Sequence, residues 1–195
     1  MPKIVTEAEK QRVKELMFYS AIDLIRSKGL RKIAVEDLTR ESGISKGSFY
    51  MYYKSREELL YEVLKRSESD MFNSMILLKN DKCTKEEKIK KALHDIYLAK
   101  GSLILYITPG DYKSLLKRLP GEIYEKEKQR SDNYFELAMN LFEIDPKSLD
   151  MSVLAQLMDS LVFVANNNTN NYADGRERAL EIIINSIADY IVSKS

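Results

Sequence analysis

An all-α fold is predicted by three features of this sequence of 195 residues. Pro and Gly, which most often interrupt helices, number only four and seven, while Leu, Ile, Lys and Glu are abundant. Apolar residues recur at spacings of three and four over long stretches, as on one face of a helix. A Ser or Thr followed three residues later by Glu forms a capping box, which marks a helix start, at Thr6, Ser55 and Thr84. We expect about nine helices and no sheet.

The first helix is expected to begin at Thr6 and to end at Gly29, which tolerates the backbone conformation of a helix stop. Its buried face is predicted from the apolar residues at helical spacing, which are Val13, Leu16, Met17, Ala21, Leu24 and Ile25. Two short helices follow, over about 35–42 and 46–52.

The stretch 35–54 has the pattern of a helix-turn-helix. Gly43 lies where the first short helix must turn, and Ser45 is a suitable N-cap for the second. Phe49 and Tyr53 are four residues apart, so they aim one face of the second helix inward. In such a unit the second helix enters the major groove of DNA.

The rest of the chain is predicted to form six further helices, of which the last two carry wide apolar stripes. The expected ranges are about 55–78, 84–106, 111–118, 122–142, 148–166 and 174–193. The Asn-rich segment between the last two helices is expected to be a solvated loop.

Charge and composition favour a cytoplasmic protein. The net charge is +1, but residues 1–66 carry 14 Lys or Arg against 10 Asp or Glu, which places the basic half with the helix-turn-helix. Cys83 is the single cysteine, so it forms no intramolecular disulfide. The charged N-terminus lacks the apolar core of a signal peptide, and no apolar run is long enough to span a membrane.

An enzyme is disfavoured because no constellation of catalytic residues is evident. His94 is the single histidine, whereas a catalytic triad or a histidine-based metal cluster needs further partners. The carboxylates stand mostly beside lysines in patterns typical of solvated helix faces. We therefore expect no metal and no cofactor.

The stretch from Lys10 to Leu60 resembles the DNA-binding domain of the TetR/AcrR family of transcriptional regulators. The resemblance rests on the pattern AVEDL…SGISKGSFYMYYKSREEL, with its GIS turn, KGS-aromatic helix and Lys-Ser-x-Glu-Glu-Leu entry to the next helix. It implies a helix-turn-helix DNA-binding domain over residues 1–54 and a helical ligand-binding and dimerisation domain over 55–195. It also implies a homodimeric repressor that leaves a pseudo-palindromic operator when a small-molecule effector binds.

The residues expected to contact DNA lie on or beside the second short helix, on a face that is small, basic or hydrogen-bonding. They are Ser45, Lys46, Gly47, Ser48, Tyr50, Met51, Tyr52 and Lys54. Lysine and hydroxyl groups suit phosphate oxygens or base edges, whereas a methionine offers only apolar contact, for example with a thymine methyl. The alternative is a solvated, partly aromatic helix face. The sequence departs from the family pattern at two places. Ile33 and Ala34 cannot cap the first short helix with a hydroxyl, and Met51 stands where the family often has His, Tyr or Arg.

For the C-terminal part, the aromatic and methionine residues suggest an effector pocket with apolar walls and a few hydroxyls. The candidates are Tyr97, Tyr106, Tyr134, Met139, Met158 and Phe163, although each could equally be plain core. The stripes over 148–166 and 174–193 predict a homodimer face, with internal core as the alternative. A helical protein-interaction adaptor without ligand control is the alternative function for the whole chain.

Overall fold

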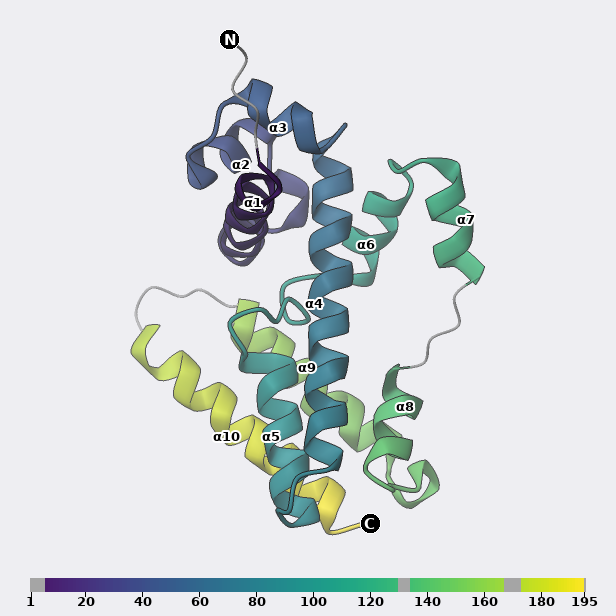
Figure 1. Ribbon diagram of the computed structural model, residues 1–195. Helices are drawn as coiled ribbons and strands as arrows, with labels where there is room; N and C mark the ends of the chain where they lie inside the picture. The colour runs from purple at the N-terminus through teal and green to yellow at the C-terminus, as the bar shows by residue number, and fades with distance from the viewer. Residues whose placement is uncertain (1–5, 130–133, 167–172, 195) are drawn as a thin grey trace. The chain divides into compact units, whose positions relative to one another are not determined.

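The computed structural model describes residues 6–129, 134–166 and 173–194, and within them it is built from helices alone (Figure 1). The predicted all-α fold is therefore confirmed, with ten α-helices and two 3-10 helices rather than about nine helices. Their bounds are α1 Glu7–Lys28, η1 Leu30–Lys32, α2 Val35–Ser42, α3 Lys46–Tyr52, α4 Arg56–Lys79, α5 Lys85–Leu98, α6 Pro109–Leu116, α7 Gly121–Gln129, α8 Tyr134–Leu141, η2 Pro146–Ser148, α9 Met151–Asn166 and α10 Ala173–Val192.

By packing, the described chain divides into two compact units. The first unit holds the residues up to Ser67 together with Ile107–Gln129, and the second holds Glu68–Tyr106 with the residues from 134 onward. The long helix α4 contributes to both units. The predicted boundary between residues 54 and 55 concerns function, and it stays a prediction.

In the first unit, α1 begins and ends as the sequence predicts. The hydroxyl of Thr6 accepts the N–H of Glu9 at 3.2 Å, and the Glu9 carboxylate accepts the N–H of Thr6 at 2.9 Å. At the other end Gly29 has a φ of 78°, a region that side chains disfavour. The buried face of α1 includes Met17, Ile22 and other apolar residues. Helix α1 packs on α2 and so supports the helix-turn-helix.

The helix-turn-helix has the predicted turn. Gly43 adopts a left-handed conformation, with φ of 68° and ψ of 25°, and so ends α2. Ser45 then caps α3, because its hydroxyl accepts the N–H of Ser48 at 3.0 Å. Phe49 is fully buried and Tyr53 is 5% exposed, which confirms that this face of α3 is core.

Helix α5 ends at Leu98, about two turns before the predicted end near Tyr106. The reason is that Leu103 and Leu105 are both buried while Ile104 between them is 44% exposed. In a helix, residues two apart point in very different directions, so both leucines reach the core only if the chain leaves the helix. The N–H of Ser102 instead closes a turn on the carbonyl of Ala99 at 2.8 Å.

The range of the single helix predicted over 122–142 is described in two parts, α7 and α8, and the continuity of that helix stays a prediction. Helix α7 belongs to the first unit and α8 to the second, and residues 130–133 lie outside the described part. Helix α8 is anchored by Met139, which is 6% exposed in the core of the second unit. The charged α7 carries no such apolar stripe.

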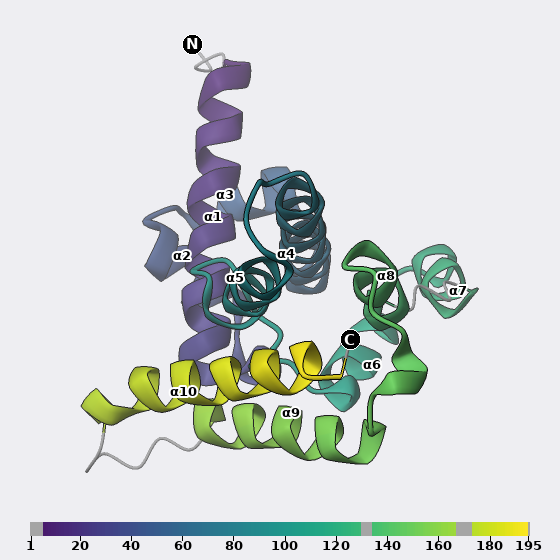
Figure 2. The same cartoon turned by 90° about the horizontal axis from the view of Figure 1, so that it is seen from below.

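Helices α9 and α10 lie side by side in the second unit (Figure 2), and α5 packs against α10. Most of their predicted apolar stripe serves the core of this unit. The buried members include Leu154, Leu161, Ala165, Ile187, Ala188 and Ile191. Other apolar residues of the two helices stay exposed, notably Phe163 at 66% and Ile182 at 60%.

The predicted Asn-rich loop falls largely on 167–172, outside the described residues. Within the described chain, no helix combines the length and the apolar character needed to cross a membrane.

Candidate nucleic-acid interface

All eight residues predicted to contact DNA lie on α3 or at its two ends, and none of them is buried. Ser48 and Tyr52 are half-buried, and the other six are exposed. The large side chains among these are conspicuous, because Met51 is 70% and Tyr50 is 52% exposed. Helix α3 thus has one face fixed in the core by Phe49 and another that presents apolar and hydroxyl groups to solvent.

The start of α3 is organised by two hydroxyl groups. The hydroxyls of Ser45 and Ser48 lie 2.9 Å apart and share a hydrogen bond, in addition to the cap bond from the N–H of Ser48. The Ser48 hydroxyl oxygen keeps at least one acceptor site whichever of the two hydroxyls donates, since a hydroxyl has one proton and two lone pairs. Both remain suited to polar contacts at the helix start.

Gly47 is not required by packing within the protein. A Cβ at this position would meet the Ser45 hydroxyl oxygen at 3.7 Å, an ordinary van der Waals distance. Glycine lowers helix stability relative to alanine by roughly 0.5–1 kcal/mol. A glycine that packing within the protein does not require is expected where another molecule must approach the backbone closely.

Lys46, the first residue of α3, is paired with a carboxylate from α2. Its Nζ lies 2.5 Å from Oε1 of Glu36, and the two side chains are 55% and 62% exposed. The hydrogen bond between them raises the pKa of Lys46 and lowers the pKa of Glu36. The role of Glu36 could not be predicted from the sequence, because residues ten apart on two different helices give no periodic signal.

Lys54 follows α3 and is exposed, as a phosphate contact requires. The hydroxyl of Ser55 caps α4 by accepting the N–H of Glu58 at 3.2 Å. The Glu58 carboxylate accepts the N–H of Lys54 at 2.8 Å. The capping box predicts instead that it accepts the N–H of Ser55. A phosphate that uses the N–H of Lys54 must therefore displace the Glu58 carboxylate.

Tyr53 fixes the end of α3 against the rest of the unit. Its hydroxyl donates to the Glu62 carboxylate of α4 at 3.0 Å, and the Lys14 ammonium lies 5.6 Å from the ring centroid. Burial, with the Glu62 carboxylate beside it, raises the pKa of the Tyr53 phenol. Tyr53 thus joins α3 to α4 and is not free to contact DNA.

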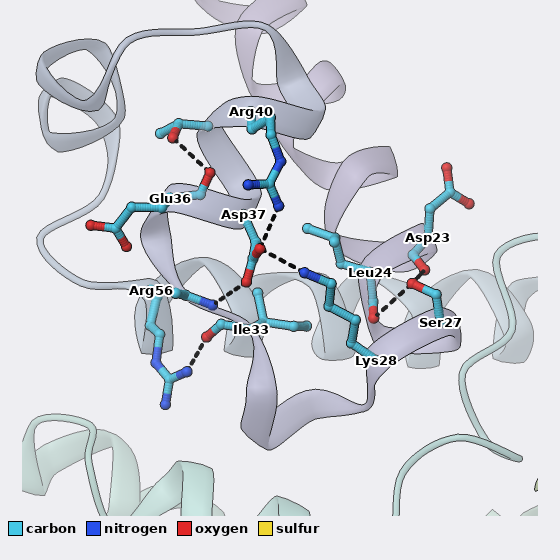
Figure 3. Close-up of polar contacts among 11 residues, drawn as sticks. Asp23, Leu24, Ser27, Lys28, Ile33, Glu36, Asp37, Arg40 and Arg56 are labelled. Atoms are coloured by element: carbon cyan, nitrogen blue, oxygen red, sulfur yellow. Dashed lines mark hydrogen bonds and ion pairs between the residues drawn. The ribbon is translucent and has the colours of Figure 1, made fainter.

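Helix α2, which precedes the turn, begins without a hydroxyl cap, as the residues Ile33 and Ala34 predict. Asp37 supplies the missing acceptor, because its carboxylate accepts the N–H of Ala34 at 3.0 Å (Figure 3). The same carboxylate binds the Lys28 ammonium at the end of α1 and the Arg40 guanidinium, each at 2.6 Å. The hydrogen bond from Lys28, with those from Ala34 and Arg40, lowers the pKa of Asp37 to about 2.

This pKa predicts how stability depends on pH. A carboxyl with a lowered folded-state pKa stabilises the fold fully above its unfolded value near 3.9, and the contribution disappears as pH falls toward 2. We expect Asp37→Asn to be less stable than the wild type by a constant amount above about pH 5, and the difference to shrink between about pH 4 and pH 2. Urea unfolding at several pH values measures it.

The matched control is Glu41→Gln, which removes one negative charge from the same helix at an exposed position. A stability difference for Asp37→Asn that did not change with pH, or an equal response of Glu41→Gln, would contradict the assignment to Asp37.

Arg56, at the start of α4, holds the loop that leads into α2. Its Nη1 donates to the carbonyl of Ile33 (Figure 3), and its Nε donates to the Glu57 carboxylate at 2.9 Å. Glu57 also lies 3.6 Å from Arg118, just after α6. These contacts tie α4 to the entry of the helix-turn-helix. The contact of Arg56 with Ile33 has no signature in the sequence, because its acceptor is a backbone carbonyl.

Of the six residues predicted to line an effector pocket, the five with described side chains lie in different surroundings. The Tyr97 hydroxyl donates to the Met158 sulfur at 2.8 Å within the core of the second unit, and burial raises the pKa of Tyr97 to about 12. Tyr106 packs against the same core and Met139 is part of it, whereas Phe163 faces solvent. The side chain of Tyr134 lies outside the described residues. Their role in binding a ligand stays a prediction.

A cleft of about 450 Å³ opens elsewhere in the second unit, among α4, α5 and α10. His94, which is 54% exposed, lines it, together with Lys91, Asp95 and Glu181. The described residues contain no group of three or more His, Cys, Asp or Glu that could hold a metal ion.

Comparisons with known proteins agree with the geometry of α2 and α3. Residues 20–63 match the model for bacterial regulatory proteins of the tetR family. Two uncharacterized HTH-type transcriptional regulators of Bacillus subtilis (strain 168) are similar. YuxN is 29% identical over 83 residues, which are 43% of this chain and 28% of that protein. YerO is 32% identical over 82 residues, which are 41% of this chain and 28% of that protein. The chain therefore spans less than a third of the length of these curated relatives.

A similar fold is also found among solved structures. A TetR-like transcriptional regulator from Rhodococcus sp. RHA1 covers 94% of this chain and 97% of its own, with a TM-score of 0.52 and 17% identity. At this identity the likeness concerns the fold. The match to a family of regulators agrees with the expectation that the chain is not an enzyme.

Proposed function

Because this chain belongs through residues 20–63 to the TetR family of bacterial regulatory proteins, we propose that it is a sequence-specific DNA-binding transcriptional regulator. The observation that carries the proposal is the exposed face of α3, where Tyr50 and Met51 are 52% and 70% exposed. Large apolar side chains on a surface are favoured where a partner covers them. Here they stand beside the Lys46 ammonium and two serine hydroxyls, which are groups that reach phosphates and base edges.

The finer proposal is a homodimeric repressor that leaves a pseudo-palindromic operator in the cytoplasm when a small molecule binds. Exposed apolar residues on α9 and α10 support the dimer, because they remain after the unit's own core is filled. Two copies of α3 in one dimer would read half-sites about one helical turn apart, roughly 10 bp between centres. The effector is proposed to enter the second unit, where Tyr97 and Met158 already place a hydroxyl and a sulfur together.

Selection of bound duplexes from a random pool tests the proposed function. We expect enrichment of one sequence with two inverted half-sites, and binding that weakens steeply as salt rises, since phosphate contacts displace counterions. A pool that stayed random after repeated selection would contradict the proposal and would favour a protein-interaction adaptor.

Gly47→Ala tests whether α3 contacts DNA or is a solvated helix face. The added methyl group has room within the protein and should stabilise α3 by up to about 1 kcal/mol. If the α3 backbone approaches DNA closely, the same methyl group should weaken binding to the selected duplex by about tenfold, which corresponds to a steric penalty near 1.4 kcal/mol. Thermal unfolding and fluorescence anisotropy measure the two effects.

Ser48→Ala is the matched control, since it adds no bulk and should change preference at particular bases. Unchanged DNA affinity in Gly47→Ala would show that no close approach occurs at this glycine.

A further inference from the structure

The predicted DNA-facing segment, residues 45–54, carries two cations, Lys46 and Lys54. One of them is already engaged, because the Lys46 ammonium lies 2.5 Å from the Glu36 carboxylate. Glu36 stands in the first turn of α2 and Lys46 in the first turn of α3, so the pair bridges the two helices of the helix-turn-helix. A carboxylate next to a predicted phosphate-binding group is unexpected, because it competes with phosphate for the ammonium.

The pair is not needed to hold α2 and α3 together. Both side chains are more than half exposed, and exposed ion pairs contribute little to stability. The packing of the two helices rests instead on fully buried apolar residues such as Leu38 and Phe49. The Glu36 carboxylate also points away from the Asp37 contacts that fix the start of α2 (Figure 3). Its clearest effect is therefore on Lys46.

We infer that Glu36 is a specificity-determining residue, which holds the Lys46 ammonium and keeps it from binding phosphate on every sequence. This inference rests on the proposed DNA-binding function. A free lysine at the start of α3 would pair with any backbone phosphate, because phosphate contacts carry no sequence information. The Glu36 carboxylate holds Lys46. The lysine is released only where the base sequence lets α3 approach DNA so closely that a phosphate replaces the carboxylate.

Two physical effects act in the same direction. The carboxylate neutralises the ammonium, which removes one favourable phosphate contact from non-specific binding. It also places a negative charge next to the strongly negative DNA backbone, and like charges at an interface suppress wrong partners. Both effects reduce affinity for arbitrary DNA more than affinity for the selected duplex, where close base contacts offset them.

The test compares Glu36→Gln with the wild type by fluorescence anisotropy, on the selected duplex and on an unrelated duplex, over a range of salt. We expect Glu36→Gln to bind the unrelated duplex about two- to fivefold more tightly. This affinity ratio corresponds to the free energy of an exposed ion pair. The selected duplex should gain less, so the ratio between the two affinities falls. The slope of log affinity against log salt on unrelated DNA should steepen by about 0.9, as for one added phosphate contact.

A double-mutant cycle shows whether Glu36 acts through Lys46. In a Lys46→Gln background, the Glu36→Gln change should alter the salt slope less, because only the repulsion between the carboxylate and the phosphates remains. Glu41→Gln, an equal charge change on the same helix, is the control and should leave the ratio of affinities close to that of the wild type.

An equal effect of Glu36→Gln with and without Lys46, or of Glu41→Gln, would overturn the inference in favour of a general charge effect. No change in Glu36→Gln would overturn it as well. Failure of the proposed function is distinguishable, because then the wild type itself would prefer neither duplex.

Discussion

Phe49→Ala is expected to destabilise the protein by about 3–5 kcal/mol, the usual cost of truncating a fully buried phenylalanine. Phe49 is 0% exposed and is the residue by which α3 is fixed in the first unit. Typical domains have an unfolding free energy of about 5–15 kcal/mol, so this loss is a large share of the total. We expect a lower urea midpoint and loss of binding to the selected duplex, because α3 loses its fixed orientation.

Tyr50→Ala is the matched control, since it removes the neighbouring aromatic side chain from the exposed face. Tyr50 is 52% exposed and meets the Phe49 ring edge-on at 5.3 Å between centroids. Its removal should change the free energy of unfolding by less than about 1 kcal/mol while weakening DNA binding. Equal destabilisation by the two variants would show that α3 is not oriented as described.

The helix-turn-helix could be predicted because its determinants are local. Gly43 and Ser45 each specify one backbone feature by their own chemistry, and the structure has both the left-handed turn and the cap. Phe49 and Tyr53 could be assigned to the core because four residues make about one helical turn. Such signals need no knowledge of which helices meet.

The polar contacts between different helices at this site could not be predicted, because they join residues distant in sequence. Lys46 meets Glu36, and Asp37 meets Lys28 across the loop between α1 and α2. Arg56 donates to the backbone carbonyl of Ile33, an acceptor that every residue possesses and that no sequence pattern marks. Long charged side chains can choose among many partners, and the choice is made by helix packing.

The extent of α5 was mispredicted for a related reason. Ile96, Tyr97 and the apolar residues after them continue a plausible helical pattern, but Leu103 and Leu105 are buried together in an irregular segment. Tertiary burial outweighed local periodicity there. Burial in the unit's own core also accounts for most of the apolar stripes on α9 and α10. The breadth of a stripe therefore does not by itself distinguish a dimer face from internal core.

Phe163→Glu is expected to convert the proposed dimer to a monomer. Phe163 on α9 is 66% exposed, and it is an aromatic side chain of the kind that anchors protein interfaces. A carboxylate buried there without a partner should raise the dimer dissociation constant by about 30- to 1,000-fold, which corresponds to about 2–4 kcal/mol for an interface anchor. Sedimentation or light scattering measures the mass, and affinity for a duplex with two half-sites should fall at least about tenfold.

Leu77→Glu is the control for the general effect of a new charge in the second unit. Leu77 is 73% exposed on α4, outside the two helices of the proposed interface, so this variant should remain dimeric and should bind DNA like the wild type. Ile182→Glu on α10, which is 60% exposed, should behave like Phe163→Glu if both helices contribute to one face. Circular dichroism and the urea midpoint should stay near the wild-type values in all three variants, because none of these side chains is buried in the unit's own core. A dimeric Phe163→Glu variant, or a monomeric wild type, would contradict the proposed dimer face.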